Sequence, residues 1–205
     1  MIQEPPMTVS KSRTFLSTEE YLAAEQDSPI KHEYIKGQVY AMAGASDAHV
    51  TVSLNLATLL RNHLRGTGCR VYMADMKAQI ESANVFYYPD VMVTCDTRDK
   101  NFRYFKRYPC LIVEVLSPTT EAFDRGNKFA DYRRLETLQE YVLINPETMS
   151  VECFRRNSEG FWVLYSYGEG EEVRLASVNF AVAIANLYED VPLGDDSVSN
   201  GDRLP

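Results

Sequence analysis

The stretch Cys110-Leu111-Ile112-Val113-Glu114-Val115-Leu116 sets one carboxylate in an otherwise apolar run. Successive side chains of a strand point to opposite faces of the sheet, so a run that is apolar on both faces is typical of a central strand covered by helices on both sides. Burying Glu114 unpaired would cost several kcal/mol. The stretch therefore predicts an α/β fold and a partner for Glu114: a cation, a metal ion or a set of hydrogen bonds.

A second acid enters the sheet at Asp90, which follows Pro89 at the head of the apolar run 91–93. Two carboxylates on neighbouring strands offer the hard oxygen ligands that Mg²⁺ prefers. The same residues also allow a simpler interpretation, in which Asp90 and Glu114 each pair with an arginine. Spacing alone does not decide between these two readings.

Helices are predicted from capping residues and from apolar residues that recur with a helical period. They cover residues 18–26, 47–65 and 121–136. In the third helix, Asp124, Lys128 and Tyr132 are spaced four residues apart and share one face.

Strands are predicted from short runs that alternate or are apolar throughout. They cover a hairpin at 32–42, then 69–73, 75–81, 85–95, 110–116 and 140–145, and an antiparallel C-terminal meander at 151–155, 161–167 and 171–176, with a short helix near 182–187.

A chain of 205 residues with 45% hydrophobic content can bury one sizeable core, so we expect one domain over residues 15–192. Residues 1–14 and 193–205 are rich in Pro, Ser, Gly and Asp and are predicted to be flexible tails. No apolar run is long enough for a secretory signal or a membrane span, which predicts a soluble protein without a membrane partner.

The four cysteines, at positions 69, 95, 110 and 153, form no C-x-x-C pair. We expect them to be reduced thiols in the core, which fits a cytoplasmic protein. The net charge of −8 argues against a nucleic-acid partner, but residues 98–134 hold nine basic and five acidic residues. This segment is either a basic surface or an ordinary solvated helix and loop.

Several short sequence motifs occur in the same order as in one known family, which this chain resembles. They are His32-Glu33-Tyr34-Ile35, Tyr88-Pro89-Asp90-Val91, Val113-Glu114-Val115-Leu116-Ser117-Pro118 and Asp124-Arg125-Gly126-Asn127-Lys128-Phe129. Together they resemble the Uma family of restriction-endonuclease-like proteins, over about residues 15–192. Pro89-Asp90 followed by Glu114-x-Leu116 also resembles the PD-(D/E)XK nuclease signature.

The resemblance implies a restriction-endonuclease-like core: a mixed central β-sheet flanked by α-helices, with an antiparallel C-terminal meander. It implies an endonuclease that hydrolyses DNA phosphodiester bonds with Mg²⁺ or Mn²⁺ activating the attacking water. Asp90 and Glu114 match the metal-binding acids, and the Val115 carbonyl is a candidate third ligand. Glu33 matches an acid that holds a second metal or orients water. His49 is a candidate phosphate contact, although a capping or solvated histidine fits as well.

The chain departs from the signature at position 116, where Leu116 replaces the lysine that shares a strand face with the second acid. Lys128 on the following helix is the candidate substitute, oriented by Asp124 and Tyr132. If Lys128 pointed to solvent, catalysis would be in doubt. Gln79, on the preceding strand, is a weaker polar candidate.

Three functions remain open from the sequence. The first is an active Mg²⁺-dependent DNA endonuclease, expected as a homodimer because a double-strand cutter needs two symmetric sites. The second is a catalytically inactive nuclease-fold protein that acts in binding or regulation, and the third is a hydrolase of a small phosphorylated compound. Convergence of Glu33, Asp90, Glu114 and Lys128 beside a basic groove would favour the first.

Overall fold

The computed structural model describes residues 15–193, and the two predicted tails lie outside the described residues except for Leu193. Its main sheet has six strands in the order β11-β10-β9-β8-β6-β3. They are β3 (Arg70–Met73), β6 (Val91–Thr94), β8 (Leu111–Val115), β9 (Glu140–Asn145), β10 (Ser150–Arg156) and β11 (Trp162–Tyr167). Strands β8 and β9 run parallel and the other pairs antiparallel, so the sheet is mixed.

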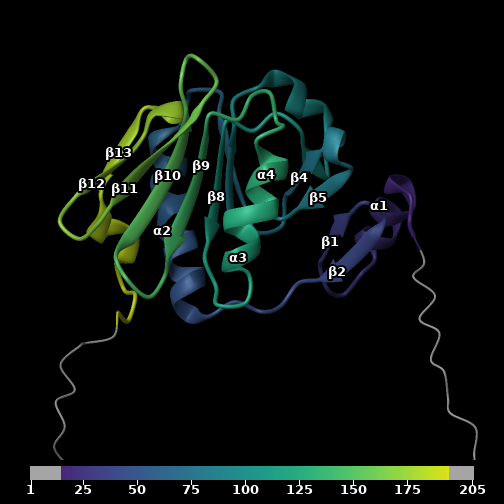
Figure 1. The fold of residues 1–205 in the computed structure, drawn as a ribbon, viewed down its shortest axis with the longest axis horizontal. Coiled ribbons are helices and arrows are strands. Elements are labelled where there is room, and N and C mark those ends of the chain that lie inside the picture. The colour runs from purple at the N-terminus through teal and green to yellow at the C-terminus, as the bar shows by residue number, and fades with distance from the viewer. Residues whose placement is uncertain (1–14, 194–205) are drawn as a thin grey trace, which may run out of the picture.

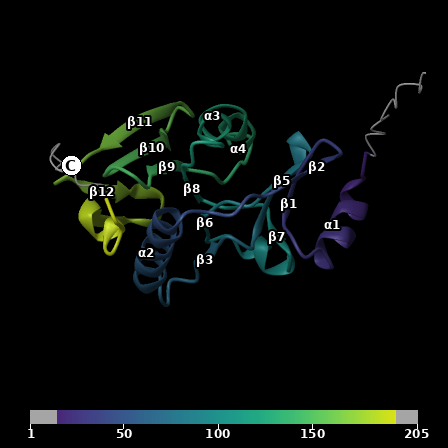
Figure 2. The ribbon, with the colours of Figure 1, turned by 90° about the horizontal axis from the view of Figure 1, so that it is seen from below.

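Strand β8 is buried along its whole length, which confirms the predicted central strand. One face of the sheet packs against α2 (Asp47–His63), and Leu111, Val113 and Val115 belong to that core. The opposite face carries Ile112 and is covered by a second helical segment (Figures 1 and 2). Since side chains alternate, Glu114 points toward this second segment.

The second helical segment consists of α3 (Glu121–Phe123), the π-helical turn η3 (Asp124–Lys128) and α4 (Phe129–Tyr132). It ends four residues before the predicted boundary at 136. Tighter bonds, such as that from the Arg134 N–H to the Asp131 carbonyl, close its last turn. Leu135 and Leu138 then enter the core, because the chain must turn back to begin β9.

A second sheet has five strands in the order β2-β1-β5-β4-β7. They are β1 (His32–Ile35), β2 (Gln38–Ala41), β4 (Lys77–Ile80), β5 (Val85–Tyr87) and β7 (Phe105–Lys106). The helix α1 (Thr18–Gln26) begins with the predicted capping box and packs Tyr21 against Tyr34 and Phe86. The predicted hairpin is confirmed, with Lys36 and Gly37 both at positive φ in its turn.

The prediction of one strand over residues 85–95 was wrong, because the chain leaves one sheet and enters the other within it. Strand β5 belongs to the five-stranded sheet and β6 to the six-stranded sheet, with Tyr88, Pro89 and Asp90 between them. Proline has no N–H to donate to a ladder, so pairing stops at Pro89. Asp90 consequently lies at the corner where the two sheets meet.

The predicted C-terminal meander is confirmed in part of its length as an extension of the main sheet, through β10 and β11. A separate hairpin follows, formed by β12 (Glu172–Leu175) and β13 (Phe180–Ala183). Phe180 and Val182 are buried and alternate with exposed alanines, so residues 180–183 form a strand where a helix was expected from 182. The remaining helices are short: η1 (Glu81–Ala83), η2 (Thr97–Asn101), η4 (Ala176–Val178) and η5 (Ile184–Tyr188).

The expectation of four reduced thiols was wrong for two of them, because Cys69 and Cys95 form a disulfide. Arg70 pairs with Thr94 in the antiparallel register of β3 and β6, so the next residues outward face each other. Their 26-residue separation conceals this contact in the sequence. Cys110 and Cys153 are free. Within residues 15–193, no helix is long and apolar enough to cross a membrane.

The packing of α2 predicts a contrast between two leucines on the same helix. Leu56 is 1% exposed in the main core, whereas Leu54 is 52% exposed. Leu56→Ala should lower the free energy of unfolding by about 2–5 kcal/mol through lost burial and a cavity. Leu54→Ala, the matched control, should change it by less than about 0.5 kcal/mol. Equal effects in urea denaturation would contradict this placement of α2.

Candidate functional site

Lys128 is the centre of a buried charged cluster on the α3–α4 side of the main sheet. Its Nζ lies 3.0 Å from Glu114 Oε1, and 3.3 Å from both Glu33 Oε1 and Asp124 Oδ1. The lysine side chain is 8% exposed, so it does not point to solvent. Lys128 therefore faces the acids, as expected from the sequence.

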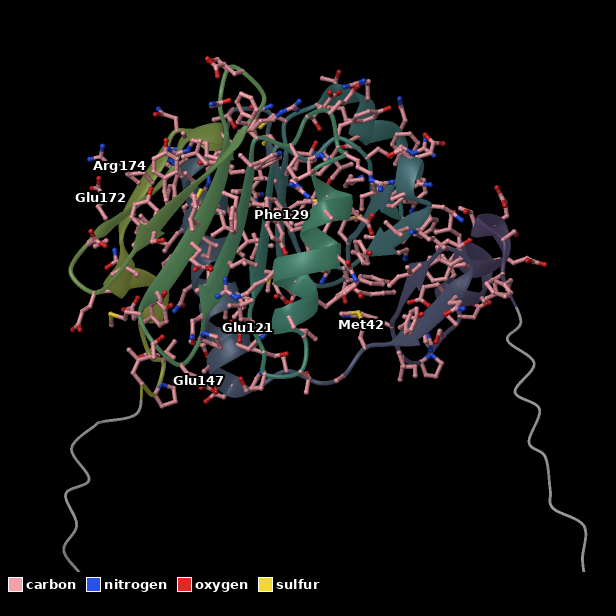
Figure 3. All side chains as sticks on the ribbon, in the orientation of Figure 1. Met42, Glu121, Phe129, Glu147, Glu172 and Arg174 are labelled. Atoms are coloured by element: carbon pink, nitrogen blue, oxygen red, sulfur yellow. A yellow bond between two sulfur atoms is a disulfide. The ribbon has the colours of Figure 1, made fainter. Side chains whose placement is uncertain are left out.

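Leu116, which stands where the signature has its lysine, makes apolar contacts. Leu116 is buried with Phe129 and Tyr132 in the smaller of the two main core clusters. Figure 3 shows Glu121 where this helical segment starts and Phe129 further along it, in front of the main sheet. The segment that packs on Leu116 thus also delivers Lys128 to Glu114.

Glu114 is held from two directions. Its Oε1 accepts a hydrogen bond of 2.9 Å from the Tyr132 hydroxyl in addition to the Lys128 contact. Burial raises the pKa of the Glu114 carboxyl well above 4.5, against the lowering effect of Lys128, and the charges of Asp124 and Asp90 raise it further. Burial opposes the charge of Lys128, but its attraction to Glu114 and Glu33 holds the pKa of the amine well above 10.5.

Asp90 has different partners, at the end of β6. Its Oδ2 accepts a 2.7 Å hydrogen bond from the Val115 N–H, and its Oδ1 lies 2.9 Å from His49 Nε2. Continuing the register of Val91 with Val113 places Asp90 directly opposite Glu114. Two acids on adjacent strands, as the sequence indicated, therefore meet at the sheet corner.

Pro89 explains why the backbone of Val115 is available there. The same register places Pro89 opposite Val115, and a proline cannot donate to the Val115 carbonyl. Both backbone groups of Val115 point to the β6 side, and the N–H is taken by Asp90. The carbonyl is left as an oxygen donor beside two carboxylates.

Asp124 is a member of the cluster that sequence reasoning assigned only to orienting Lys128. It is 2% exposed, and its Oδ1, although close to Lys128 Nζ, accepts no hydrogen bond among the described residues. It begins the π-helical turn η3, a feature that often marks functional sites. The i, i+4 spacing to Lys128 was the available signal, but acid–lysine pairs at that spacing are common on helix surfaces.

Glu33 reaches the cluster from the other sheet. It lies on β1, and its side chain is 15% exposed and contacts Lys128. The cluster thus joins Glu33 and Glu114 through one ammonium group, with Asp90 beside Glu114. The catalytic and metal-binding roles expected of these residues stay predictions.

His49 and Gln79, the two weaker polar candidates from the sequence, each contact another side chain of the protein. His49 lies in the first turn of α2 and contacts Asp90, so its role as a phosphate contact stays a prediction. Gln79 Oε1 accepts a 2.7 Å hydrogen bond from Arg107, which places it in a separate pair.

The basic segment 98–134 is largely neutralised by contacts within the protein. Arg98 pairs with Asp96 and Glu136, Arg107 with Glu81, and Arg125 with Glu121 and Glu152. Among the described residues, Lys100, Arg103, Lys106 and Arg133 of this segment form no ion pair, and Lys106 is buried and donates to the Asp99 and Phe102 carbonyls. The sequence-level excess of positive charge therefore becomes a small basic surface.

The donors near the corner have the chemistry of a Mg²⁺ or Mn²⁺ site: carboxylates of Asp90 and Glu114 and the Val115 carbonyl. Three acids, namely Glu33, Glu114 and Asp124, contact one lysine, and Asp90 lies opposite Glu114, so negative charge is in excess. In residues 15–193, no three His, Cys, Asp or Glu side chains are already grouped closely enough to hold a metal ion. The oxygen donors fit such an ion in kind, while a metal remains an expectation of the sequence.

The raised pKa of Glu114 predicts a pH dependence of stability. A carboxyl whose pKa is higher in the folded than in the unfolded protein contributes stability that is complete below pH about 4.5 and is lost as the pH rises through the folded pKa. The free energy of unfolding of the wild type minus that of Glu114→Gln should therefore fall above pH about 4.5, by at most about 1.4 kcal/mol per pH unit.

Urea denaturation of both proteins at several pH values, with EDTA present, measures this difference. Glu136→Gln is the matched control, since Glu136 is an exposed carboxylate paired with Arg98. The difference between the wild type and this control should show no fall of comparable size over the same pH range. A flat difference between wild type and Glu114→Gln as well would show that the Glu114 carboxyl titrates normally.

Comparisons with known proteins agree with this architecture. An uncharacterized protein of Synechocystis sp. is 42% identical over 173 residues, covering 84% of this chain and 91% of its own length. A second uncharacterized protein of the same organism is 32% identical over 173 residues, covering 83% and 98%. The crystal structure of a protein from Anabaena variabilis, described as a putative nuclease belonging to DUF820, matches with a TM-score of 0.68 at 15% identity, covering 83% of this chain and 96% of that one, which establishes the fold.

A family model described as "Uma2: Putative restriction endonuclease" matches residues 18–185. The match includes all the candidate site residues, from Glu33 to Lys128. The resemblance found in the sequence is thereby confirmed: the chain belongs to the Uma2 family of restriction-endonuclease-like proteins.

Proposed function

We propose that this protein is a Mg²⁺- or Mn²⁺-dependent endonuclease that hydrolyses DNA phosphodiester bonds. The observation that carries the proposal is the contact of Lys128 with both Glu114 and Glu33 in a chain that has Leu116 at the usual lysine position. Lys128 would therefore supply from the helix the charge that a strand lysine supplies in the signature.

Asp90, Glu114 and the Val115 carbonyl would hold the metal ion. When bound, the ion would lower the pKa of the attacking water and neutralise charge on the phosphate oxygens. His49 would fix the orientation of the Asp90 carboxylate, as hydrogen-bonded neighbours of metal ligands do. The Val115 N–H would do the same from the other side.

Lys128 and Glu33 would act on the substrate side of the same centre. The Lys128 ammonium is charged at neutral pH, so it would attract a phosphate oxygen or orient the attacking water rather than accept its proton. Glu33, more exposed than Glu114, would accept that proton or help hold a second ion. Tyr132 keeps Glu114 in place from the helix side.

A second function, DNA binding or regulation without cleavage, is favoured by one observation. Asp90 already has partners for both oxygens, and Glu114 Oε1 has two, so the acids can be satisfied without a metal. The net charge of −8 and the small basic surface also limit affinity for DNA. Activity and metal binding therefore have to be measured separately.

The proposal predicts nicking of supercoiled plasmid by the purified protein with Mg²⁺ or Mn²⁺, abolished by EDTA. Asp90→Ala should remove a metal ligand, and Lys128→Met should remove the charge at the phosphate. Each should reduce the rate by at least about 100-fold. Glu136→Gln, whose carboxylate lies outside the cluster, should cut at the wild-type rate.

Calorimetric titration of Mn²⁺ into the same proteins distinguishes the two functions. Wild type and Lys128→Met should bind the ion, whereas Asp90→Ala should not. Metal binding without cleavage of plasmid would support the inactive alternative for DNA. Neither binding nor cleavage, in a protein whose circular dichroism shows it to be folded, would overturn the metal-dependent mechanism.

A further inference from the structure

Strand β11 is an edge of the main sheet that carries an unusual amount of exposed apolar surface. Phe161, just before it, is 63% exposed, and within it Val163, Leu164 and Tyr165 are 39%, 48% and 41% exposed. Six residues, Trp162 to Tyr167, make it the longest edge strand of the described sheets. Proteins usually protect such edges with charges, proline or bulges, and this strand has no charged residue and no proline.

Half of the backbone groups of β11 face outward from the sheet. The Asn157 N–H donates to the Phe161 carbonyl, so odd-numbered residues of the strand point their backbone toward β10. The alternation of a strand then turns the N–H and C=O groups of Trp162, Leu164 and Ser166 away from β10. Among the described residues these groups have no backbone partner in another element.

The two faces of β11 are apolar near its centre. Trp162 packs edge-on against Phe129, which places Trp162 and Leu164 on the side of α4. Val163 and Tyr165 lie on the other side, where the Arg155 guanidinium covers part of the Tyr165 ring. An occupant of this edge must therefore be an extended strand with apolar side chains on both faces.

We propose that the occupant is β11 of a second copy of this chain, paired antiparallel about a two-fold axis through Leu164. Two outward-facing strands related in this way form reciprocal hydrogen bonds between Trp162 and the partner's Ser166, and between the two Leu164 residues. The pairing also sets Val163 against the partner's Tyr165, an aromatic–β-branched pair of the kind that stabilises sheets. The strand contains no charge to oppose the pairing, and the two six-stranded sheets become one continuous sheet.

The surface is separate from the candidate site. Figure 2 shows β11 at the margin of the molecule, with the main sheet between it and the five-stranded sheet that carries β1. The association therefore does not depend on the phosphodiester hydrolysis proposed above. The homodimer expected from the sequence would then form through β11. This pairing can be tested whether or not the protein is a nuclease.

Sedimentation velocity of the full chain over roughly micromolar to tenth-millimolar concentrations tests the pairing. The wild type should approach twice the 23.3 kDa mass of one chain. Leu164→Lys puts two like charges opposite each other at the axis, a juxtaposition that costs several kcal/mol at an interface, and should weaken the dimer at least about 100-fold. Leu54→Lys is the control, because Leu54 on α2 is similarly exposed, at 52%, and its substitution should leave the dimer intact.

Hydrogen exchange adds a readout at the strand itself. Amides of Trp162, Leu164 and Ser166 should be protected in the concentrated wild type and exchange freely in Leu164→Lys, while Val163 and Tyr165 stay protected in both by β10. A monomeric wild type at all concentrations would overturn the proposal. So would a dimer that survives Leu164→Lys, or one that Leu54→Lys dissociates, which would place the interface on α2.

Discussion

The burial of one ammonium group among three carboxylates constrains the middle of this molecule. Lys128 is expensive to remove from water, and only the nearby charges of Glu114, Glu33 and Asp124 offset that cost. Each acid comes from a different element: the central strand, the hairpin of the second sheet and the covering helix. The cluster therefore fixes the relative positions of the helix and the two sheets at the point where they meet.

The two sheets are also joined covalently through Tyr88, Pro89 and Asp90, and here the proline has a second consequence. By ending the ladder between β6 and β8, it leaves the Val115 backbone without a strand partner on that side. The Asp90 side chain takes over the N–H, so a carboxylate replaces a backbone carbonyl at the end of the strand. Pro89 thus ends the pairing of β6 with β8, and Asp90 beside it places a carboxylate at that end of the sheet.

The sequence contained enough to predict the central strand, the helices on its two faces and the neighbouring acids. Glu114 was informative because a lone charge in an apolar run has few explanations, and the spacing of Asp124, Lys128 and Tyr132 located the helix face. What could not be predicted depends on contacts between distant residues. The division into two sheets at Pro89, the disulfide between Cys69 and Cys95, and the membership of Asp124 in the cluster all required knowing which strands are neighbours.

Moving the lysine from the strand to the helix changes what positions it. The backbone that continues from β8 would position a lysine at 116 directly, because residues two apart on a strand lie on the same face, so the lysine would lie beside Glu114. Lys128 instead depends on how α4 packs over the sheet, through Phe129 against Tyr141 and Leu116 against the same cluster. Tyr132 adds a second link between this helix and the strand by donating a hydrogen bond to Glu114 from the next turn. The leucine at 116 is thus part of the same arrangement, since its packing holds the helix that carries the replacement lysine.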